Sequence, residues 1–596
     1  MSTAPTRALA PINKGSLTGL ALLFIALMAL SLIPFFTNVG DYVLNMFMQA
    51  VTYAIAVLGM TVVLGYTGQI NLAQAAFFGF GAYAVGLGTT ALGLNFWLSV
   101  LLGFGVAGLA GAILGLTTLR LGGHYLAMIT ISFQQIFDLV LNNWIEVTHG
   151  PDGIAGIERP SLFGISLVDN RRYLLFCVVV LYLIICFVWW LPNTRLGRAM
   201  RAVRENELAA SVVGVHTLRV KVIAFTISSA LAGISGALYA GGFAYVSPDN
   251  CNFARSVEFL TMVLLGGAQS PFGAALGTVL LILLPEWFRF LKQIYLAAYG
   301  LAVILIMVFL PEGLWGLVRA GWYKWRGIVA PVIASGIPPL NVEVAAKDTS
   351  PILKLENIQK HFGGIKAVDG IDLEVARGTV HALIGPNGSG KTTSLNVLNG
   401  IYTPTAGKII IDGVDATAQA PHERAGLGVG RTFQNIRLFA SLSALENVMV
   451  GAQRDNNTIP GGNAGLREQA LSALDFVGMA DRAHVIVKNL PYGHQRLVEI
   501  ARVLAGHPKL LLLDEPAAGL NQTEKQELVG LLKRLRGHGL TIFLIDHDMG
   551  LVEKVSDKIT VLNFGKKIAE GTPAEVLRHP EVIAAYLGEG PVGAPA

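Results

Sequence analysis

The sequence predicts a polytopic α-helical membrane domain followed by a soluble α/β domain that binds a nucleotide. The 596 residues are 53% hydrophobic and only 14% charged, which is too many residues for one domain and too apolar for an ordinary soluble protein. Long apolar runs fill residues 17–312, whereas residues 351–590 have the composition of a soluble α/β domain. A glycine-rich octapeptide early in the second part has the pattern of a phosphate-binding loop.

The membrane part is predicted from runs of about 20 apolar residues, the helix length that crosses the hydrocarbon core. About ten spans are expected, with both ends of the domain on the same side: 17–36, 42–64, 71–93, 96–119, 123–143, 172–192, 220–243, 255–268, 271–287 and 293–312. The first run is expected to be an uncleaved helix, because it is long, lacks a cleavage site and precedes further spans. The run 255–268 is short and is followed by Gly-Gly, which predicts a re-entrant or broken helix.

The loop charges predict the orientation of these spans. Six basic residues lie in 193–221 and three more follow the last span, which places both regions in the cytoplasm by the positive-inside rule. The cytoplasmic N-terminus, residues 1–16, contains Arg7 and Lys14 and agrees with this. Basic residues beside apolar runs indicate membrane topology rather than nucleic-acid binding. The three cysteines show no metal or disulfide spacing and are expected to be inert packing residues.

One predicted span has a polar face. Its polar residues recur every fourth position and therefore share one side of a helix: Thr130, Gln134, Asp138 and Asn142. A carboxylate inside a membrane is costly unless it faces a polar interior or a partner. This face is either the lining of a translocation path or a structural polar seam between helices.

The cytoplasmic segment Arg198–Val213 is predicted to be one amphipathic helix. It either docks onto the soluble domain as a coupling helix or lies at the lipid headgroups, and an ATP-binding domain in the same chain favours docking. Residues 313–350 lose the apolar periodicity and contain Pro331, Pro338 and Pro339, which predicts a linker. The soluble domain is then expected over 351–590, with a tail at 591–596.

The phosphate-binding loop lies between a strand and a helix start. Its octapeptide fits G-x-x-x-x-G-K-[ST] and is followed by one more threonine: Gly385, Pro386, Asn387, Gly388, Ser389, Gly390, Lys391, Thr392 and Thr393. Glycines allow backbone N–H groups to close around phosphate oxygens, and the helix N-terminus adds positive potential. Lys391 is expected to reach the β- and γ-phosphates of ATP, and Thr392 to bind Mg²⁺.

Residues far along the chain are expected to complete this site. Leu510–Leu513 is a buried strand that ends in two carboxylates, of which Asp514 is expected to hold Mg²⁺ and Glu515 to polarise the attacking water. His547 ends the next strand and is expected to contact the γ-phosphate. Gln434 is expected to reach Mg²⁺ and the water. Phe362, at a turn between strands 352–358 and 371–375, either stacks on adenine or packs in the core.

A second anion site is predicted before the helical run Arg496–Ala505. It contains Leu490, Gly493 and Gln495, and a helix N-terminus after glycine binds anions. A second phosphate-binding helix end in one domain is explained if it serves a nucleotide held by a partner domain.

In its motifs and their order, the second half resembles an ABC-transporter nucleotide-binding domain over about 240 residues. The chain differs from the common Leu-Ser-Gly-Gly-Gln signature at Pro491 and Tyr492, and from the usual Ser-Ala-Leu-Asp at Ala518-Gly519-Leu520-Asn521. The sequences Glu-Pro-Ala-Ala-Gly-Leu-Asn and Leu-Pro-Tyr-Gly are similar to those of the G-type ATPase of branched-chain amino acid importers. The membrane half resembles the M-type permease of these importers, in Gly65-Tyr66-Thr67-Gly68-Gln69-Ile70-Asn71 and in Gly150-Pro151-Asp152-Gly153-Ile154.

This resemblance implies a type I-like importer in which permease and ATPase are fused. It implies ATP hydrolysis with Mg²⁺, uptake of Leu, Ile or Val, and a multi-pass location in the bacterial inner membrane with the ATPase domain in the cytoplasm. It also implies a periplasmic binding protein, a second permease and a second ATPase, or else a second copy of this chain. Urea and short-amide importers share the architecture and are the alternative. An exporter or a membrane-tethered regulatory ATPase fits the short loops and many spans less well.

Overall fold

The computed structural model describes most of both halves of the chain. Described are residues 40–119, 123–162, 164–288, 294–310, 313–318, 337–340, 350–453 and 462–587, with positions 25, 28, 29, 32 and 290. Most of the predicted span 17–36 and linker, and all of the N-terminal segment 1–16 and tail 591–596, lie outside these residues. Two compact units are present: a helical unit within 11–204 and 218–329, and an α/β unit that combines 205–217 with the region after residue 330.

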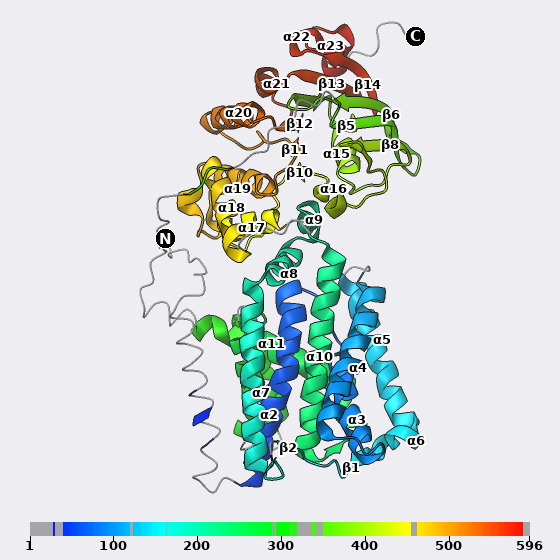
Figure 1. Ribbon diagram of the computed structural model, residues 1–596, viewed down its shortest axis with the longest axis vertical. Coiled ribbons are helices and arrows are strands. Elements are labelled where there is room, and N and C mark those ends of the chain that lie inside the picture. The colour runs from blue at the N-terminus through cyan, green and yellow to red at the C-terminus, as the bar shows by residue number, and fades with distance from the viewer. Residues whose placement is uncertain are drawn as a thin grey trace. The chain divides into compact units, whose positions relative to one another are not determined.

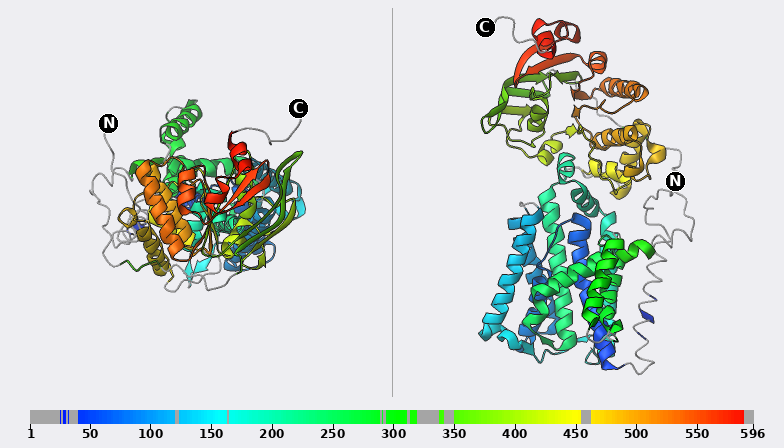
Figure 2. Two further views of the ribbon diagram at one scale, coloured as in Figure 1. Left: turned by 90° about the horizontal axis from the view of Figure 1, so that it is seen from above. Right: turned by 180° about the vertical axis from the view of Figure 1, so that it is seen from behind.

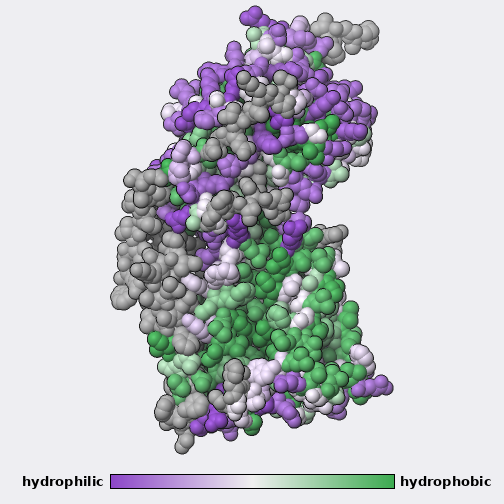
Figure 3. Space-filling view, in the orientation of Figure 1, coloured by the Kyte–Doolittle hydropathy of each residue, from purple (hydrophilic) through white to green (hydrophobic). Residues whose placement is uncertain are grey.

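Long apolar helices make up the helical unit (Figure 1). They are α2 (Asp41–Met60) continued by the π-helix η1 (Thr61–Tyr66), α4 (Phe96–Thr118), α5 (Gly123–Asn143), α7 (Asn170–Trp190) and α10 (Thr217–Phe243). Five helices in the described part of the chain are long and apolar enough to cross a membrane. In the view from behind, α4 and α5 form one edge of the unit (Figure 2), and Leu101, Leu109 and Ile136 on this edge are more than half exposed. The surface of the unit in Figure 3 is mainly hydrophobic, as expected for contact with lipid.

Of the four remaining predicted spans, those at 71–93 and 293–312 are shorter than expected, and those at 255–268 and 271–287 have the expected lengths. All four are short helices. They are α3 (Gln74–Thr90), α11 (Phe253–Gly266), α12 (Pro271–Trp287) and α13 (Tyr295–Phe309), with 17, 14, 17 and 15 residues. The span predicted at 71–93 corresponds to α3, which begins only at Gln74. Residues 71–73 before it are not helical, and Gly68 has a φ of +70°. As expected, the run at 255–268 is a broken helix: Gly267 ends α11 with a φ of +110°, and α12 follows after the turn.

Small residues let the central helices touch. A Cβ at Gly81 of α3 would lie 1.8 Å from the carbonyl oxygen of Gly233 in α10. A Cβ at Gly236 of α10 would lie 1.8 Å from the carbonyl oxygen of Phe78 in α3. The backbones of α3 and α10 are therefore in direct contact, which only glycine allows at these positions. At one end of the unit, the two-residue strand β1 (Ile154–Ala155) pairs antiparallel with β4 (Tyr245–Val246).

Two sheets form the α/β unit. The larger sheet has the order β10-β11-β12-β7-β13-β14, with only β14 antiparallel, and the smaller one has the order β6-β5-β8-β9. The strands are β5 (Leu353–Phe362), β6 (Ile365–Val375), β7 (Val380–Ile384), β8 (Ala406–Ile411), β9 (Val414–Asp415), β10 (Val429–Arg431), β11 (Leu510–Asp514), β12 (Thr541–Ile545), β13 (Lys558–Asn563) and β14 (Lys566–Gly571). The two predicted strands before the loop are longer than expected, because they form one hairpin that turns at Gly363–Gly364.

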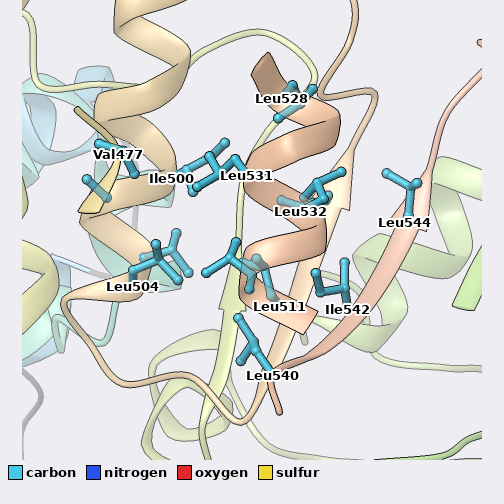
Figure 4. Close-up of a cluster of buried hydrophobic side chains, with 14 of the residues drawn as sticks. Val477, Ile500, Leu504, Leu511, Leu528, Leu531, Leu532, Leu540, Ile542 and Leu544 are labelled. Carbon is cyan, nitrogen blue, oxygen red and sulfur yellow. The ribbon is translucent and has the colours of Figure 1, made fainter. Parts of the chain in front are cut away.

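Helices pack around the sheets and on one another. They include α15 (Lys391–Leu398), α16 (Pro421–Gly426), α17 (Ala444–Ala452), α18 (Asn463–Phe476), α19 (Tyr492–Leu504), α20 (Gln522–Gly537), α21 (Met549–Val555), α22 (Pro573–Val576) and α23 (Pro580–Leu587). Figure 4 shows Leu511, Ile542 and Leu544 of the strands beside leucines of α20, with Ile500 and Leu504 of α19 in the same buried cluster. This core fixes the strand ends at which the candidate site lies.

The predicted helix Arg198–Val213 is in fact two helices, α8 (Arg195–Glu205) and α9 (Glu207–Val212). Asn206 interrupts the helix because its backbone is extended, with φ −158° and ψ 102°. Its side chain then accepts a hydrogen bond from the N–H of Ala209 and begins α9. Amphipathic periodicity does not reveal such a capped break, since apolar positions recur on both sides of it.

Candidate functional site

The phosphate-binding loop joins β7 to α15. Gly385, Gly388 and Gly390 have φ values of +153°, +80° and +97°. A Cβ at Gly385 would lie 2.2 Å from the carbonyl oxygen of Leu562, and one at Gly390 would lie 2.3 Å from that of Ala367. The loop therefore needs glycine both for its backbone conformation and for its close contact with neighbouring strands. The Nζ of Lys391 donates hydrogen bonds of 2.9 Å to the carbonyl oxygens of Gly385 and Pro386, so the ammonium lies over the loop.

Two buried polar atoms beside the loop make no hydrogen bond to any described residue: Oγ of Ser389 and Oδ1 of Asp514. The other carboxylate oxygen of Asp514 accepts a 3.1 Å hydrogen bond from Arg431, and both side chains are only 2% exposed. Burial raises the pKa of Asp514 and lowers the pKa of Lys391, because removal from water disfavours the charged form of each group. Oδ1 of Asp514 has no partner among the described residues and lies beside the loop, so it fits the role of a Mg²⁺ ligand. The hydroxyl of Thr392, which is exposed, would be a second ligand.

Glu515, Gln434 and His547 lie together at one edge of the larger sheet. Strands β10, β11 and β12 are adjacent and parallel, so their carboxyl ends meet there. The Nε2 of Gln434 donates to one oxygen of Glu515 at 2.8 Å, and Nε2 of His547 lies 2.7 Å from the other. Glu515 has a φ of +45°, which is unusual for a non-glycine residue. Its backbone N–H donates a hydrogen bond to the carbonyl oxygen of Ile545 in β12. Gln434 and His547 therefore hold the Glu515 carboxylate in one orientation at the edge of the sheet.

Asp546 organises this edge, although the sequence did not single it out. Its carboxylate accepts hydrogen bonds from the N–H groups of Ala517, at 3.1 Å, and Asp548, at 2.9 Å. It therefore ties the turn after Glu515 to the turn that contains His547. The available signal was an acid directly before His547, at the end of a buried strand.

The segment that holds Gln434 is bound to α19 by a buried charge cluster that the sequence analysis missed. Arg496 donates to the carbonyl oxygens of Phe433 and Gln434 at 2.6 and 2.8 Å. Glu499 forms ion pairs with Arg496 at 3.1 Å and Arg502 at 3.6 Å, and all three side chains are at most 1% exposed. Their spacing of three residues on an otherwise apolar helical face was the signal that could have revealed them.

The second predicted anion site has a different local structure from the one expected. Helix α19 begins at Tyr492, so Gly493 lies in its first turn rather than before it. A Cβ at Gly493 would lie 2.4 Å from a carboxylate oxygen of Glu524. Gln495 donates a 2.8 Å hydrogen bond back to the carbonyl oxygen of Leu490, which is itself buried. The Tyr492 ring covers Gly519, where a Cβ would lie 2.9 Å from the ring.

Phe362 is the last residue of β5 and does not lie in the turn itself. Its ring is 43% exposed and makes an edge contact with Tyr402, with 5.3 Å between ring centroids. The Nζ of Lys360 lies 5.1 Å from the centroid of Phe362. Phe362 is therefore not a packed core residue, and an aromatic face with a nearby cation is available for a flat base.

Two of the four polar residues of α5 form a seam between helices. Gln134 accepts hydrogen bonds from the N–H of Ala76 at 2.8 Å and from Ser256 at 3.0 Å, and donates to the carbonyl of Cys251 at 2.6 Å. Thr130 accepts from the N–H of Leu72, and both side chains are fully buried. Asp138 is half-buried and accepts a 3.1 Å hydrogen bond from Asn142. Thr130 and Gln134 therefore hold α3 in place, and they use their polar groups to do so.

Comparison with known proteins connects both units to one family. The permease component of the branched-chain amino acid transport system matches residues 42–311, the ABC transporter family matches 368–518, and the branched-chain amino acid ATP-binding cassette transporter family matches 566–591. Over 251 residues the chain is 43% identical to the high-affinity branched-chain amino acid transport ATP-binding protein BraF of Pseudomonas aeruginosa, covering 40% of this chain and 98% of BraF. The chain belongs to the branched-chain amino acid ABC transporter family.

The membrane half has its own relative in this family. The permease protein LivM of Salmonella typhimurium is 33% identical over 333 residues, which cover 52% of this chain and 78% of LivM. The chain is therefore a permease and an ATP-binding subunit of this ABC transporter family in one polypeptide. Among solved structures, the ATP-binding cassette MJ1267 in its ADP conformation matches 40% of this chain and all of that chain, with 32% identity and a TM-score of 0.37.

Proposed function

We propose that this chain imports branched-chain amino acids across the bacterial inner membrane, driven by ATP hydrolysis. The observation that carries the proposal is the junction of a permease with an ATP site whose Glu515 carboxylate is held at both oxygens by Gln434 and His547. BraF and LivM, which are similar to the two halves, are described as components of high-affinity branched-chain amino acid transport. An importer of urea or short amides would have the same site and remains the second candidate.

In the proposed mechanism, the loop Gly385–Thr393 and Lys391 bind the phosphates of ATP, and Phe362 stacks on adenine. Mg²⁺, held by Thr392, Asp514 and Gln434, would neutralise charge on the β- and γ-phosphates. Glu515 accepts a proton from the attacking water, and His547 contacts the γ-phosphate. The element Leu490–Gln495, with Gly493 in the first turn of α19, would meet the nucleotide of a partner ATPase domain.

We further propose a complete transporter with a second permease, a second ATPase or a second copy of this chain, and a periplasmic binding protein. Residues 17–312 would form the permease domain, 313–350 the linker and 351–590 the ATPase, with the N-terminus and the ATPase in the cytoplasm. Residues 205–217, which include α9, group with the α/β unit in the structure, and this supports a coupling role for the segment 198–213. Closure on ATP would move this segment and reorient the permease, through differential affinity for the closed state.

The test is uptake in proteoliposomes that contain this chain, its partner subunits and the binding protein. We expect ATP-dependent accumulation of Leu, Ile or Val, and we expect Glu515→Gln to abolish it. Asp138→Ala, which leaves the seam at Gln134 intact, is expected to abolish uptake without loss of expression if Asp138 and Asn142 line the path. Hydrolysis with no uptake, or with efflux only, would refute import, and accumulation of urea alone would select the second candidate.

A further inference from the structure

An ion pair lies at the middle depth of the helical unit. Arg255 and Glu258, three residues apart in α11, bind each other through Nη1 and Oε2. The guanidinium of Arg255 lies 5.1 Å from the ring centroid of Tyr53. Tyr53 is the thirteenth residue of the 26-residue helix Asp41–Tyr66, so each end of that helix is about 20 Å away along its axis. The neighbour of Arg255 in sequence, Ser256, bonds to Gln134, the twelfth residue of the 21-residue helix α5.

A pair of charges at this depth cannot face lipid at low cost. The side chains of Arg255 and Glu258 are 22% and 31% exposed, so part of each side chain lies at the surface of the unit. An ionisable group in the hydrocarbon centre costs about 2.5–3.5 kcal/mol or more, and such groups face a bundle interior or a water-filled path instead. The surface that contains Arg255 and Glu258 is therefore one that a polar path or a second permease covers.

The two charges match an amino-acid solute. A free amino acid carries a carboxylate and an ammonium on the same carbon, and a guanidinium binds a carboxylate with two parallel hydrogen bonds. The Nε of Arg255 is buried and makes no hydrogen bond among the described residues, so the pair with Glu258 does not use all the donors of the guanidinium. Tyr53, which is fully buried against Phe78, Tyr239 and Phe259, holds the guanidinium in place by its ring face.

We propose that Arg255 and Glu258 recognise the solute in transit, Arg255 binding its carboxylate and Glu258 its ammonium. This inference rests on the proposed import of amino acids. In the absence of solute the two side chains neutralise each other, which keeps the site stable at mid-depth. An entering amino acid replaces the one internal ion pair with two ion pairs to the solute, so neither side chain is left without a counter-charge. A solute with only one of the two charges leaves one side chain unpaired, and the site therefore selects against it.

The experiment compares three variants with the wild-type chain in reconstituted transporters with saturating solute-loaded binding protein. Uptake of labelled leucine and ATP hydrolysis are both measured. Arg255→Met together with Glu258→Met removes both charges, and an apolar pair of similar volume commonly preserves stability. Arg255→Lys keeps the charge but loses the forked donor geometry. Thr278→Val is the control, because Thr278 is buried and its hydroxyl bonds only within its own helix, to the carbonyl of Ala274.

If the pair recognises solute, the double variant retains ATP hydrolysis but loses leucine uptake by at least about 30-fold, and Arg255→Lys loses about 10-fold or more. Thr278→Val keeps both activities. If the pair is only structural, the double variant and Arg255→Lys take up leucine at the wild-type rate, and this result overturns the proposal. If the double variant does not fold, the uptake of Arg255→Lys decides in the same way. Failure of the wild-type chain to accumulate any branched-chain amino acid would refute the proposed import itself, whatever the variants do.

Discussion

The buried cluster around Glu499 provides the sharpest test of how the ATP site is held. Glu499 is fully buried between Arg496 and Arg502 and also accepts a 3.2 Å hydrogen bond from the N–H of Arg437. Glu499→Gln keeps the shape of the side chain but leaves two guanidinium groups, 1% and 0% exposed, without a counter-charge. Removal of one partner from a buried ion pair costs about 3–5 kcal/mol. We therefore expect the free energy of unfolding to fall by this amount.

The assay is denaturant and thermal unfolding of residues 350–596, followed by circular dichroism. This half is a natural unit to purify, because BraF and LivG are separate chains that it matches over 98% and 99% of their length. For a domain of this size, about 3–5 kcal/mol corresponds to a melting temperature lower by roughly 6–20 °C. Tryptophan fluorescence would not report it, since all eight tryptophans precede residue 326.

The control variant is Glu527→Gln on the exposed side of α20, which is expected to change stability by less than about 0.5 kcal/mol. Because Arg496 also holds the carbonyl oxygens of Phe433 and Gln434, Glu499→Gln should slow ATP hydrolysis even under conditions where the domain stays folded. A loss of stability below about 1 kcal/mol, with normal hydrolysis, would show that the cluster neither requires its carboxylate nor positions Gln434.

Three further predictions concern single positions. Glu515→Gln should bind ATP but hydrolyse it about 10²–10⁴-fold more slowly, and wild-type turnover in that variant would displace Glu515 as the base. Gly519→Ala should reduce hydrolysis and stability, because φ is +76° and the new Cβ would meet the Tyr492 ring at 2.9 Å; adding Tyr492→Ser should recover part of the loss, and no recovery would leave backbone strain as the whole cause. Burial lowers the pKa of His381 from 6.5 to about 4; the unfolded chain therefore takes up a proton that the folded one does not, and the isolated half should lose about 3 kcal/mol as the pH falls from about 6.5 to 4. His381→Asn should flatten this part of the stability curve, and an unchanged curve would assign the loss to other groups.

Much of the ATP site could be predicted from the chain alone. The loop Gly385–Thr392 is local, since its glycines, Lys391 and Thr392 need no distant partner to be recognised. The strand ends at Asp514, Glu515 and His547 were predictable because carboxyl ends of adjacent parallel strands meet at one edge of a sheet, and the register of β11 and β12 confirms that these strands are paired. The contact of Gln434 with Glu515 was not predictable, because it depends on Arg496 in a helix more than sixty residues away.

The helical unit was less predictable. Hydropathy measures apolar length, and it therefore found the spans but overestimated α3 and α13. The start of α3 follows Gly68, which has a positive φ, and its first N–H groups donate to the side chains of Ser256 and Gln134. The polar face of α5 is divided in the same way. Periodicity places Gln134 and Asp138 on one side of a helix. Only packing shows that Gln134 accepts hydrogen bonds from Ala76 and Ser256, whereas Asp138 is half-buried.

The sequence by itself therefore determined the order of the two units, the family motifs and the candidate phosphate-binding residues, because these depend on composition and on short spacings. Only the tertiary structure decided which charges are paired and at what depth. Arg255 and Glu258 are unremarkable in a linear reading, three residues apart on a short helix. They become a candidate solute site only because Arg255 packs on Tyr53, at the midpoint of the long helix Asp41–Tyr66. An ion pair at this depth is costly unless it faces a polar path or a partner.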